Sequence, residues 1–165
     1  MTKKQEAPDN KKIIVPLPSE ELQEALALVW DTFSTCESEE LPQEAIDEFW
    51  ERIDYEYMLH RMGDGTIRFW GAYDDGYLVG VCALRELSRI ELLYVDPEYQ
   101  RQGIATNLLK HALIDSRELD DSLRRVTVNA TPYSRGFFLK MGFTAVASEH
   151  KEDGLILIPM ALEGK

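Results

Sequence analysis

The stretch Leu93-Tyr94-Val95-Asp96-Pro97-Glu98-Tyr99-Gln100-Arg101-Gln102-Gly103-Ile104-Ala105 decides the fold, because it passes from strand to loop to helix. Apolar residues up to Val95 predict a strand, and Asp96-Pro97 ends it. From Ile104 onward, apolar residues recur at helical spacing and predict an amphipathic helix that reaches about Arg117.

The loop in this stretch has the features of an anion site. Backbone N–H groups at a helix N-terminus are unpaired, and together with the helix dipole they attract a negative charge. Gly103 and Ala105 carry little bulk, which lets a pyrophosphate approach the backbone, and Arg101 adds a charged donor. A turn residue before a helix explains Gly103 equally well on local spacing alone, so both interpretations stay open at this point.

Further strands and helices are expected on both sides of this stretch. Strands are expected at residues 13–15, 67–73, 77–84, 89–95, 126–130, 143–148 and 155–160. Helices are expected from Ser19 to about Phe33, from after Pro42 until Gly63-Asp64-Gly65 stops it, and over residues 104–117 and 133–141. This order predicts an α/β fold of the α+β type, in which roughly six to seven strands form a mixed central sheet flanked by about four helices.

Length and composition set the broad class. The 165 residues fit one domain, expected over residues 13–165 after a polar lead at 1–12 that we expect to be disordered. No apolar run approaches the roughly 18 residues of a membrane span, so no membrane partner is expected. Cys36 and Cys82 offer neither a disulfide framework nor metal-ligand spacing, and we therefore predict no metal and a cytoplasmic location.

Acidic residues are concentrated in one region. Between Ser19 and Asp64 there are 14 Asp and Glu residues against Arg52 and Arg61, whereas the net charge of the whole chain is −12. Two interpretations fit this imbalance. The acidic residues form solvated helix faces, or they form an acidic rim of the binding site that concentrates a cationic acceptor. Nucleic acid is not an expected partner, because phosphate binding needs a basic footprint.

Two motifs together resemble the GNAT superfamily of N-acetyltransferases. The pyrophosphate motif of that family is Gln or Arg, two residues, Gly, one residue, then Gly or Ala, and Gln100, Gly103 and Ala105 match it. A later segment, Asn129 to Ser134 followed by Phe138 and Gly142-Phe143, is similar to the second cofactor motif of the family. The order of elements agrees from about Ile13 to the last strand, and bacterial members with unassigned substrates are the most similar.

The resemblance implies acetyl-CoA as co-substrate and a sheet that is splayed where it binds. Leu93 and Val95 would offer main-chain groups to the pantetheine arm, and residues 101–106 would donate N–H groups to the pyrophosphate. Asn129 would bind the pantetheine from the facing strand, and residues 133–135 would border the thiol. The cofactor-binding residues implied in this way are Leu93, Tyr94, Val95, Gln100, Arg101, Gln102, Gly103, Ile104, Ala105, Thr106, Asn129, Ser134 and Phe138.

Glu91 is the candidate base, because a glutamate on this strand serves many relatives and an amine must lose a proton before it attacks a thioester. Apolar neighbours are expected to raise the pKa of Glu91. Strand alternation places Glu91 on one face with Leu93 and Val95, opposite residues 90, 92 and 94. The alternative is an ion pair between Glu91 and a cross-strand arginine such as Arg85 or Arg89.

The thiolate donor is less clear, because Phe138 stands where the family has a tyrosine. Three alternatives are open: Tyr133 or Ser134 donates, water does, or the domain binds acyl-CoA without catalysis. The sequence therefore predicts an acetyl-CoA-dependent N-acetyltransferase in which Glu91 and Tyr133 are catalytic and an amine attacks directly in a ternary complex. The acceptor would be an amine of a small molecule or peptide, with a cation favoured, and the protein a monomer or homodimer. A non-catalytic acyl-CoA-binding module is the alternative function.

Overall fold

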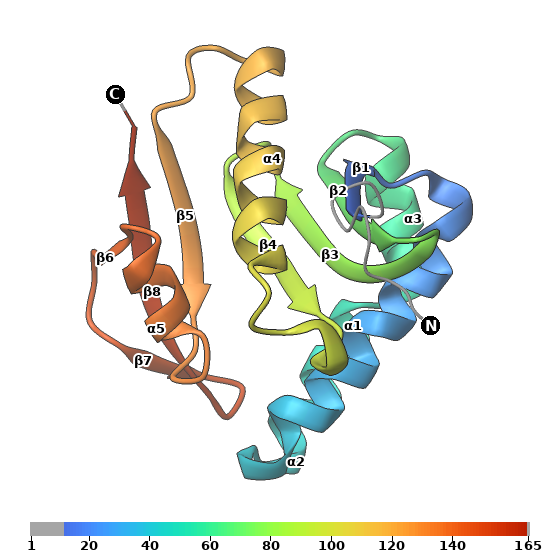
Figure 1. The fold of residues 1–165 in the computed structure, drawn as a ribbon. Helices are drawn as coiled ribbons and strands as arrows, with labels where there is room; N and C mark the ends of the chain where they lie inside the picture. The colour runs from blue at the N-terminus through green and yellow to red at the C-terminus, as the bar shows by residue number, and fades with distance from the viewer. Residues whose placement is uncertain (1–11, 165) are drawn as a thin grey trace.

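A mixed sheet runs through the molecule, and the computed structural model describes it over residues 12–164 (Figure 1). Its strands within this range are β1 (Lys12–Pro16), β2 (Ile67–Asp74), β3 (Tyr77–Arg85), β4 (Arg89–Val95), β5 (Arg125–Ala130), β6 (Thr144–Ala145), β7 (His150–Glu152) and β8 (Leu155–Glu163). Their order is β1-β2-β3-β4-β5-β8-β6, and β7 pairs with β8. Only β4 and β5 are parallel neighbours among these strands.

Helices cover both faces of the sheet (Figure 1). The α-helices within residues 12–164 are α1 (Leu22–Cys36), α2 (Gln43–Arg52), α3 (Tyr55–Gly63), α4 (Ile104–Leu119) and α5 (Arg135–Lys140). One hydrophobic cluster joins α4 and α5 to the sheet, and it contains Trp70, Leu108, Leu109 and Phe138. A second cluster joins α1, α2 and α3 to the other face through residues such as Phe33, Phe49 and Leu92. The predicted class of fold is confirmed, with more strands and helices than expected.

The sheet is splayed between β4 and β5. These strands pair at two positions only, Arg89 opposite Thr127 and Ile90 opposite Val128. Beyond these pairs β4 continues to Val95 and β5 to Ala130 without a ladder between them, and Figure 1 shows the strands diverging. Two diverging strands leave backbone groups without a strand partner, which an extended ligand can use.

A β-bulge in β4 changes the predicted alternation of side chains. Ala83 pairs with Leu92 and Leu84 pairs with Ile90, so Glu91 is the extra residue. A bulge of this kind rotates the strand by one position. Ile90 therefore packs in the cluster beneath α4 together with Val95, whereas Leu92 packs beneath α1. The expectation that residues 90 and 92 share a face is wrong for this reason, and Glu91 points toward α3.

Two other expected elements are interrupted. The single helix predicted between Pro42 and Gly63 is two helices, because Asp54 caps α3 by accepting a hydrogen bond from the Tyr57 N–H. The first strand of the predicted C-terminal hairpin consists of the separate short strands β6 and β7. The predicted disordered lead lies outside the described residues except for Lys12, which begins β1. In the described part of the chain, no helix is long and apolar enough to cross a bilayer.

Candidate active site

The loop between β4 and α4 presents its backbone to solvent. Arg101 and Gly103 have left-handed backbone torsions, with φ of 66° and 82°. Gly103 is the N-cap of α4 and offers no side chain to the first N–H groups of the helix. A methyl group built on Gly103 would meet no atom within 4 Å, so the space above the loop is open. The predicted anion site thus has donors and room, and Ile104 anchors it because its side chain is 6% exposed in the core.

Gln100 fixes this loop to the end of the strand. Its side-chain amide donates a hydrogen bond of 2.9 Å to the Val95 carbonyl oxygen. The side chain of Gln102 lies elsewhere, because its amide oxygen accepts a hydrogen bond from Lys12 Nζ at 2.9 Å. Of the two glutamines, Gln100 therefore has a positioning role in the loop, and its binding to a ligand stays a prediction.

A cavity of about 140 Å³ opens between the diverging ends of β4 and β5, and we call it the strand-end cavity. It brings together many of the residues that the sequence predicts for the site: Glu91, Leu93, Tyr94, Val95, Gln100, Asn129, Tyr133, Ser134 and Phe138. The predicted residues 101–106 are not part of its wall and lie in the loop and at the start of α4. The site is therefore a cavity plus an exposed backbone loop.

The aromatic and hydroxyl residues of the second motif differ in their surroundings. Phe138 is 4% exposed and packs edge-on against Phe143, so its ring belongs to the core as well as to the cavity wall. The Ser134 hydroxyl accepts a hydrogen bond of 3.0 Å from the Thr131 N–H. The Tyr133 side chain is 57% exposed. Burial of the remaining part raises its pKa to about 12, and a hydrogen bond with Cys36 adds to this rise. Tyr133 therefore holds its proton at neutral pH.

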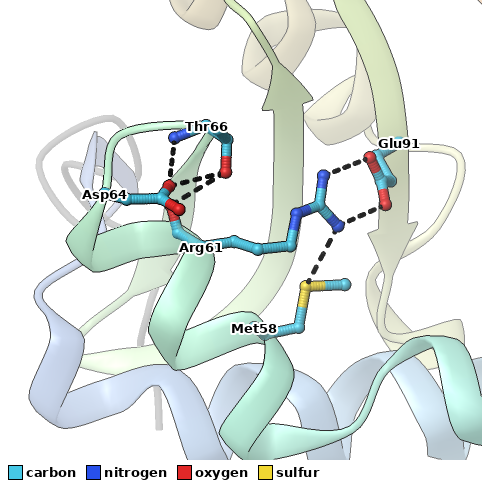
Figure 2. Close-up of polar contacts among 5 residues, drawn as sticks. All are labelled: Met58, Arg61, Asp64, Thr66 and Glu91. Carbon is cyan, nitrogen blue, oxygen red and sulfur yellow. Dashed lines mark hydrogen bonds and ion pairs between the residues drawn. The ribbon is translucent and has the colours of Figure 1, made fainter.

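Glu91 forms an ion pair with a residue that sequence analysis did not assign to the site. Arg61, on α3, donates two hydrogen bonds to its carboxylate, at 2.9 Å and 3.1 Å (Figure 2). Figure 2 also shows Met58 Sδ beside the guanidinium, and the Asp64 carboxylate accepting hydrogen bonds from Thr66 where α3 ends. The alternative to a catalytic role was an ion pair with a cross-strand arginine such as Arg85 or Arg89, but the partner comes from a helix because the bulge turns Glu91 toward α3.

This pair reverses the expected shift of the Glu91 pKa. Burial alone raises it, but the hydrogen bonds from Arg61 and the positive charges of Arg61, Arg85 and Arg52 outweigh burial, and the net pKa is lowered. The expectation of a raised pKa is wrong for that reason. A carboxylate held ionised by a bidentate arginine is a weak proton acceptor near neutral pH.

Glu37, at the C-terminal end of α1, has the shifted pKa that was expected of Glu91. Burial raises the pKa of Glu37 to about 7, although the hydrogen bond with Tyr94 favours the charged form and limits the rise. Burial also holds the Tyr94 hydroxyl protonated, so Tyr94 acts as the donor in this pair. Sequence analysis assigned no role to Glu37, and only its position after an amphipathic helix distinguishes it from the neighbouring Glu39 and Glu40.

Three cavities meet at Glu37. The first is the strand-end cavity. The second, of about 270 Å³, we call the arginine-lined cavity, because Arg52, Arg61, Arg85 and Arg89 are in its wall. The third, which we call the acidic hollow, has about 950 Å³ and is bordered by Glu39, Glu40 and Glu44. Glu37 and Thr131 are the two residues that line all three, so the Glu37 carboxyl lies where a ligand between β4 and β5 would meet a second ligand.

Comparison with protein families gives a match over most of the chain. Residues 37–164 match the family model described as an acetyltransferase (GNAT) domain. A curated relative, the uncharacterised N-acetyltransferase YafP of Escherichia coli K12, is 31% identical over 103 residues. That alignment covers 62% of this chain and 62% of the relative, so the chain is matched to less than two thirds of the length of that protein.

Solved structures with low sequence identity share the fold. A GCN5-related N-acetyltransferase from Rhodopseudomonas palustris superposes with a TM-score of 0.77 at 20% identity, covering 93% of this chain and 96% of that one. The PaiA N-acetyltransferase from Thermoplasma acidophilum, solved with coenzyme A, gives 0.77 at 21% identity and coverage of 92% and 98%. Spermidine N-acetyltransferase from Vibrio cholerae, solved with CoA and spermine, gives 0.64 at 17% identity and coverage of 93% and 96%.

Proposed function

The chain belongs to the GNAT acetyltransferase family, and on that premise we propose that it transfers an acetyl group from acetyl-CoA to an amine by direct attack in a ternary complex. The acceptor would be an amine of a small molecule or peptide. The amine nitrogen forms a bond to the thioester carbonyl carbon, and the carbon–sulfur bond then breaks. One proton leaves the amine and one proton reaches the departing thiolate.

The splay between β4 and β5 is the observation that carries this proposal. The strand-end cavity lies between the two diverging strands. In the loop that follows β4, the backbone at Gly103 is open. The pantetheine of acetyl-CoA would lie between the strands, beside Leu93, Val95 and Asn129. The pyrophosphate would accept hydrogen bonds from the N–H groups of residues 101–106. PaiA, which shares the fold, was solved with coenzyme A, and that supports a CoA ligand here.

Glu37 is the proton acceptor that this geometry favours. It lines the strand-end cavity and two further cavities, so its carboxyl group would be available to an amine that reaches the thioester from either of them. Glu91 is bound by Arg61 through two hydrogen bonds, so it would position the side chains of the cavity wall rather than accept a proton. A base works best when its pKa is near the working pH, which the Glu37 environment supplies.

Tyr133 would supply the proton for the thiolate. It lines the strand-end cavity, which Phe138 also lines, and its hydroxyl keeps its proton at neutral pH. Ser134 is the alternative donor, and its hydroxyl already takes part in hydrogen bonds with Thr131. Tyr133→Phe is expected to lower kcat while leaving the Kd of acetyl-CoA unchanged.

Binding and turnover test the proposed function. Calorimetry with acetyl-CoA should show binding, and release of the free CoA thiol should exceed hydrolysis for some member of a panel of amines. Binding without release by any amine would favour the alternative, a non-catalytic acyl-CoA-binding module. An absence of both heat and a thermal shift would refute each of these functions.

The pH–rate profile separates the two glutamates. Wild-type kcat/KM should fall below about pH 7 as Glu37 takes up a proton. Glu37→Gln should lower kcat/KM and remove that acidic limb, because no titrating carboxyl remains at the junction. Glu56→Gln, an exposed position on α3, is the matched control and should leave the profile intact. An acidic limb that persists in Glu37→Gln and disappears in Glu91→Gln would assign the base to Glu91.

A further inference from the structure

The arginine-lined cavity has a basic wall, although the helical region that forms part of this wall is strongly acidic. The helical region from Ser19 to Asp64 has 14 acidic residues and two basic ones, Arg52 and Arg61. Both basic residues line this cavity, whereas Glu37 is the only one of those 14 carboxylates in its wall. The acidic excess of the helices therefore does not extend to this surface.

Two further arginines reach the cavity from the sheet, and most of this charge is not neutralised. Arg85 ends β3 and Arg89 begins β4. Arg61 is paired with Glu91, but no salt bridge within residues 12–164 holds Arg52, Arg85 or Arg89. The remaining carboxylates of the wall are Glu152 and Glu37. A proton on Glu37 would leave the wall more positive still.

This cavity borders the site where the thioester would lie. It shares with the strand-end cavity the residues Glu37, Ile90, Glu91, Tyr94, Asn129 and Thr131. The acidic hollow shares only Glu37, Thr131 and Tyr133 with the strand-end cavity, and its carboxylates Glu39, Glu40 and Glu44 do not line either smaller cavity. The arginine-lined cavity is thus the closer neighbour of β4, and the hollow is a wider approach from outside.

Resting on the proposed function, we propose that the acceptor is an amine that also carries an anionic group, a carboxylate or a phosphate, and that this group binds in the arginine-lined cavity. Its amine would lie at the Glu37 junction, toward the thioester, and its anionic group would lie toward Arg52 and Arg85. Guanidinium groups bind both anions through charge-assisted hydrogen bonds, and several arginines on one wall add to the attraction. A molecule with one amine and one anionic group then meets a complementary charge at each end.

Matched pairs of acceptors test this inference. CoA thiol release is measured with glycine and glycinamide, with O-phosphoethanolamine and ethanolamine, and with spermidine as a cation. The member that carries the anionic group should, in at least one pair, have a kcat/KM about ten-fold or more above that of the partner without it, since a charged hydrogen bond distinguishes them. The pair with the larger ratio separates a carboxylate from a phosphate.

Arginine variants show whether the cavity is the cause. Arg85→Gln and Arg52→Gln should reduce the kcat/KM ratio within each pair toward one, mainly by raising KM for the acceptor that carries the anionic group. Arg68→Gln removes an exposed arginine of β2 that does not line this cavity, and it should preserve the ratio. Thermal midpoints of all three variants check that they fold.

Each remaining outcome decides between the hypotheses. Faster turnover of spermidine, or of the amines that lack an anionic group, would overturn this inference while the proposed acetyl transfer stood. A preference for anionic amines that survives in both Arg85→Gln and Arg52→Gln would also overturn it. Bound acetyl-CoA without release by any amine would instead refute the proposed function itself.

Discussion

Removal of Arg61 tests how the Glu91 carboxylate is kept ionised. The two side chains are 9% and 17% exposed, and two hydrogen bonds of 2.9 Å and 3.1 Å join them. Arg61→Met keeps much of the aliphatic length of the side chain but removes the charge. Glu91 is then left half-buried and without its hydrogen-bonded partner, although Arg85 and Arg52 still act on it from a greater distance.

The expected loss of stability is large. Breaking a buried ion pair by removing one partner costs about 3 to 5 kcal/mol, and the partial exposure of Glu91 favours the lower end, about 3 kcal/mol. For a domain of this size, each kcal/mol lowers Tm by roughly 2 to 4 °C, which gives a fall of about 6 to 12 °C. Arg68→Met, at an exposed strand position, is the control and should cost less than about 0.5 kcal/mol.

The effect should depend on pH in a defined direction. In the wild type the Glu91 pKa is lowered from 4.5, so its stabilising contribution is complete above that value and is lost as pH falls through the folded pKa. In Arg61→Met, burial acts with less opposition and the Glu91 pKa rises. A protonated Glu91 needs no partner, so the difference between wild type and variant should shrink between pH 7 and pH 4.

Urea unfolding followed by circular dichroism at pH 4, 5, 6 and 7 measures this difference. The double variant Arg61→Met/Glu91→Gln should recover part of the loss at pH 7, because the unpaired charge is gone. A destabilisation that is equal at pH 4 and pH 7 would refute the electrostatic reasoning. So would a double variant less stable than Arg61→Met at pH 7.

Three further predictions concern other parts of the fold. Gly103→Ala should destabilise the protein by about 1 kcal/mol in urea unfolding, since φ is 82° and no neighbour obstructs the new methyl, and Gly103→Asn should cost less. In the native protein a thiol reagent should modify half-buried Cys36 and spare Cys82, whose burial raises its pKa to about 12; two reactive thiols before unfolding would contradict this. Trp70→Phe should lower the urea midpoint by leaving Asp115 without the 2.8 Å hydrogen bond from Trp70 Nε1, and an unchanged midpoint would show that water replaces it.

Local patterns predicted the fold well where one element follows directly from the next. The β2–β3 hairpin and the transition from β4 through Gly103 into α4 are confirmed, because their signals are contiguous in the chain. The family prediction is confirmed by a model that matches residues 37–164. The break at Asp54 was missed, because apolar residues continue at nearly helical spacing across it and the N-cap acts through one side chain.

The chemistry of the site was harder to predict because it depends on contacts between distant segments. Glu91 was selected by its strand, yet its pKa is set by Arg61, which is thirty positions away in the sequence and is brought to it by a bulge and a helix. Glu37 gave no signal of its own, since its shifted pKa arises from burial against Tyr94 after the chain has folded. Strand alternation failed at the same bulge, where one extra residue exchanges the two faces.

The net charge of a region does not determine the charge that a ligand meets inside it. Between Ser19 and Asp64 the carboxylates lie mainly on outward helix faces, where water solvates them at little cost. Arg61 is buried and lines one cavity together with Arg52 and two strand arginines, Arg85 and Arg89. Because salt screens charges that lie more than about 10 Å apart, a ligand in this cavity should be bound mainly by the arginines beside it, and the carboxylates on the outer helix faces should mainly affect solubility. A cationic acceptor inferred from net charge and an anionic one inferred from the cavity wall are therefore opposite predictions, and the matched acceptor pairs distinguish them.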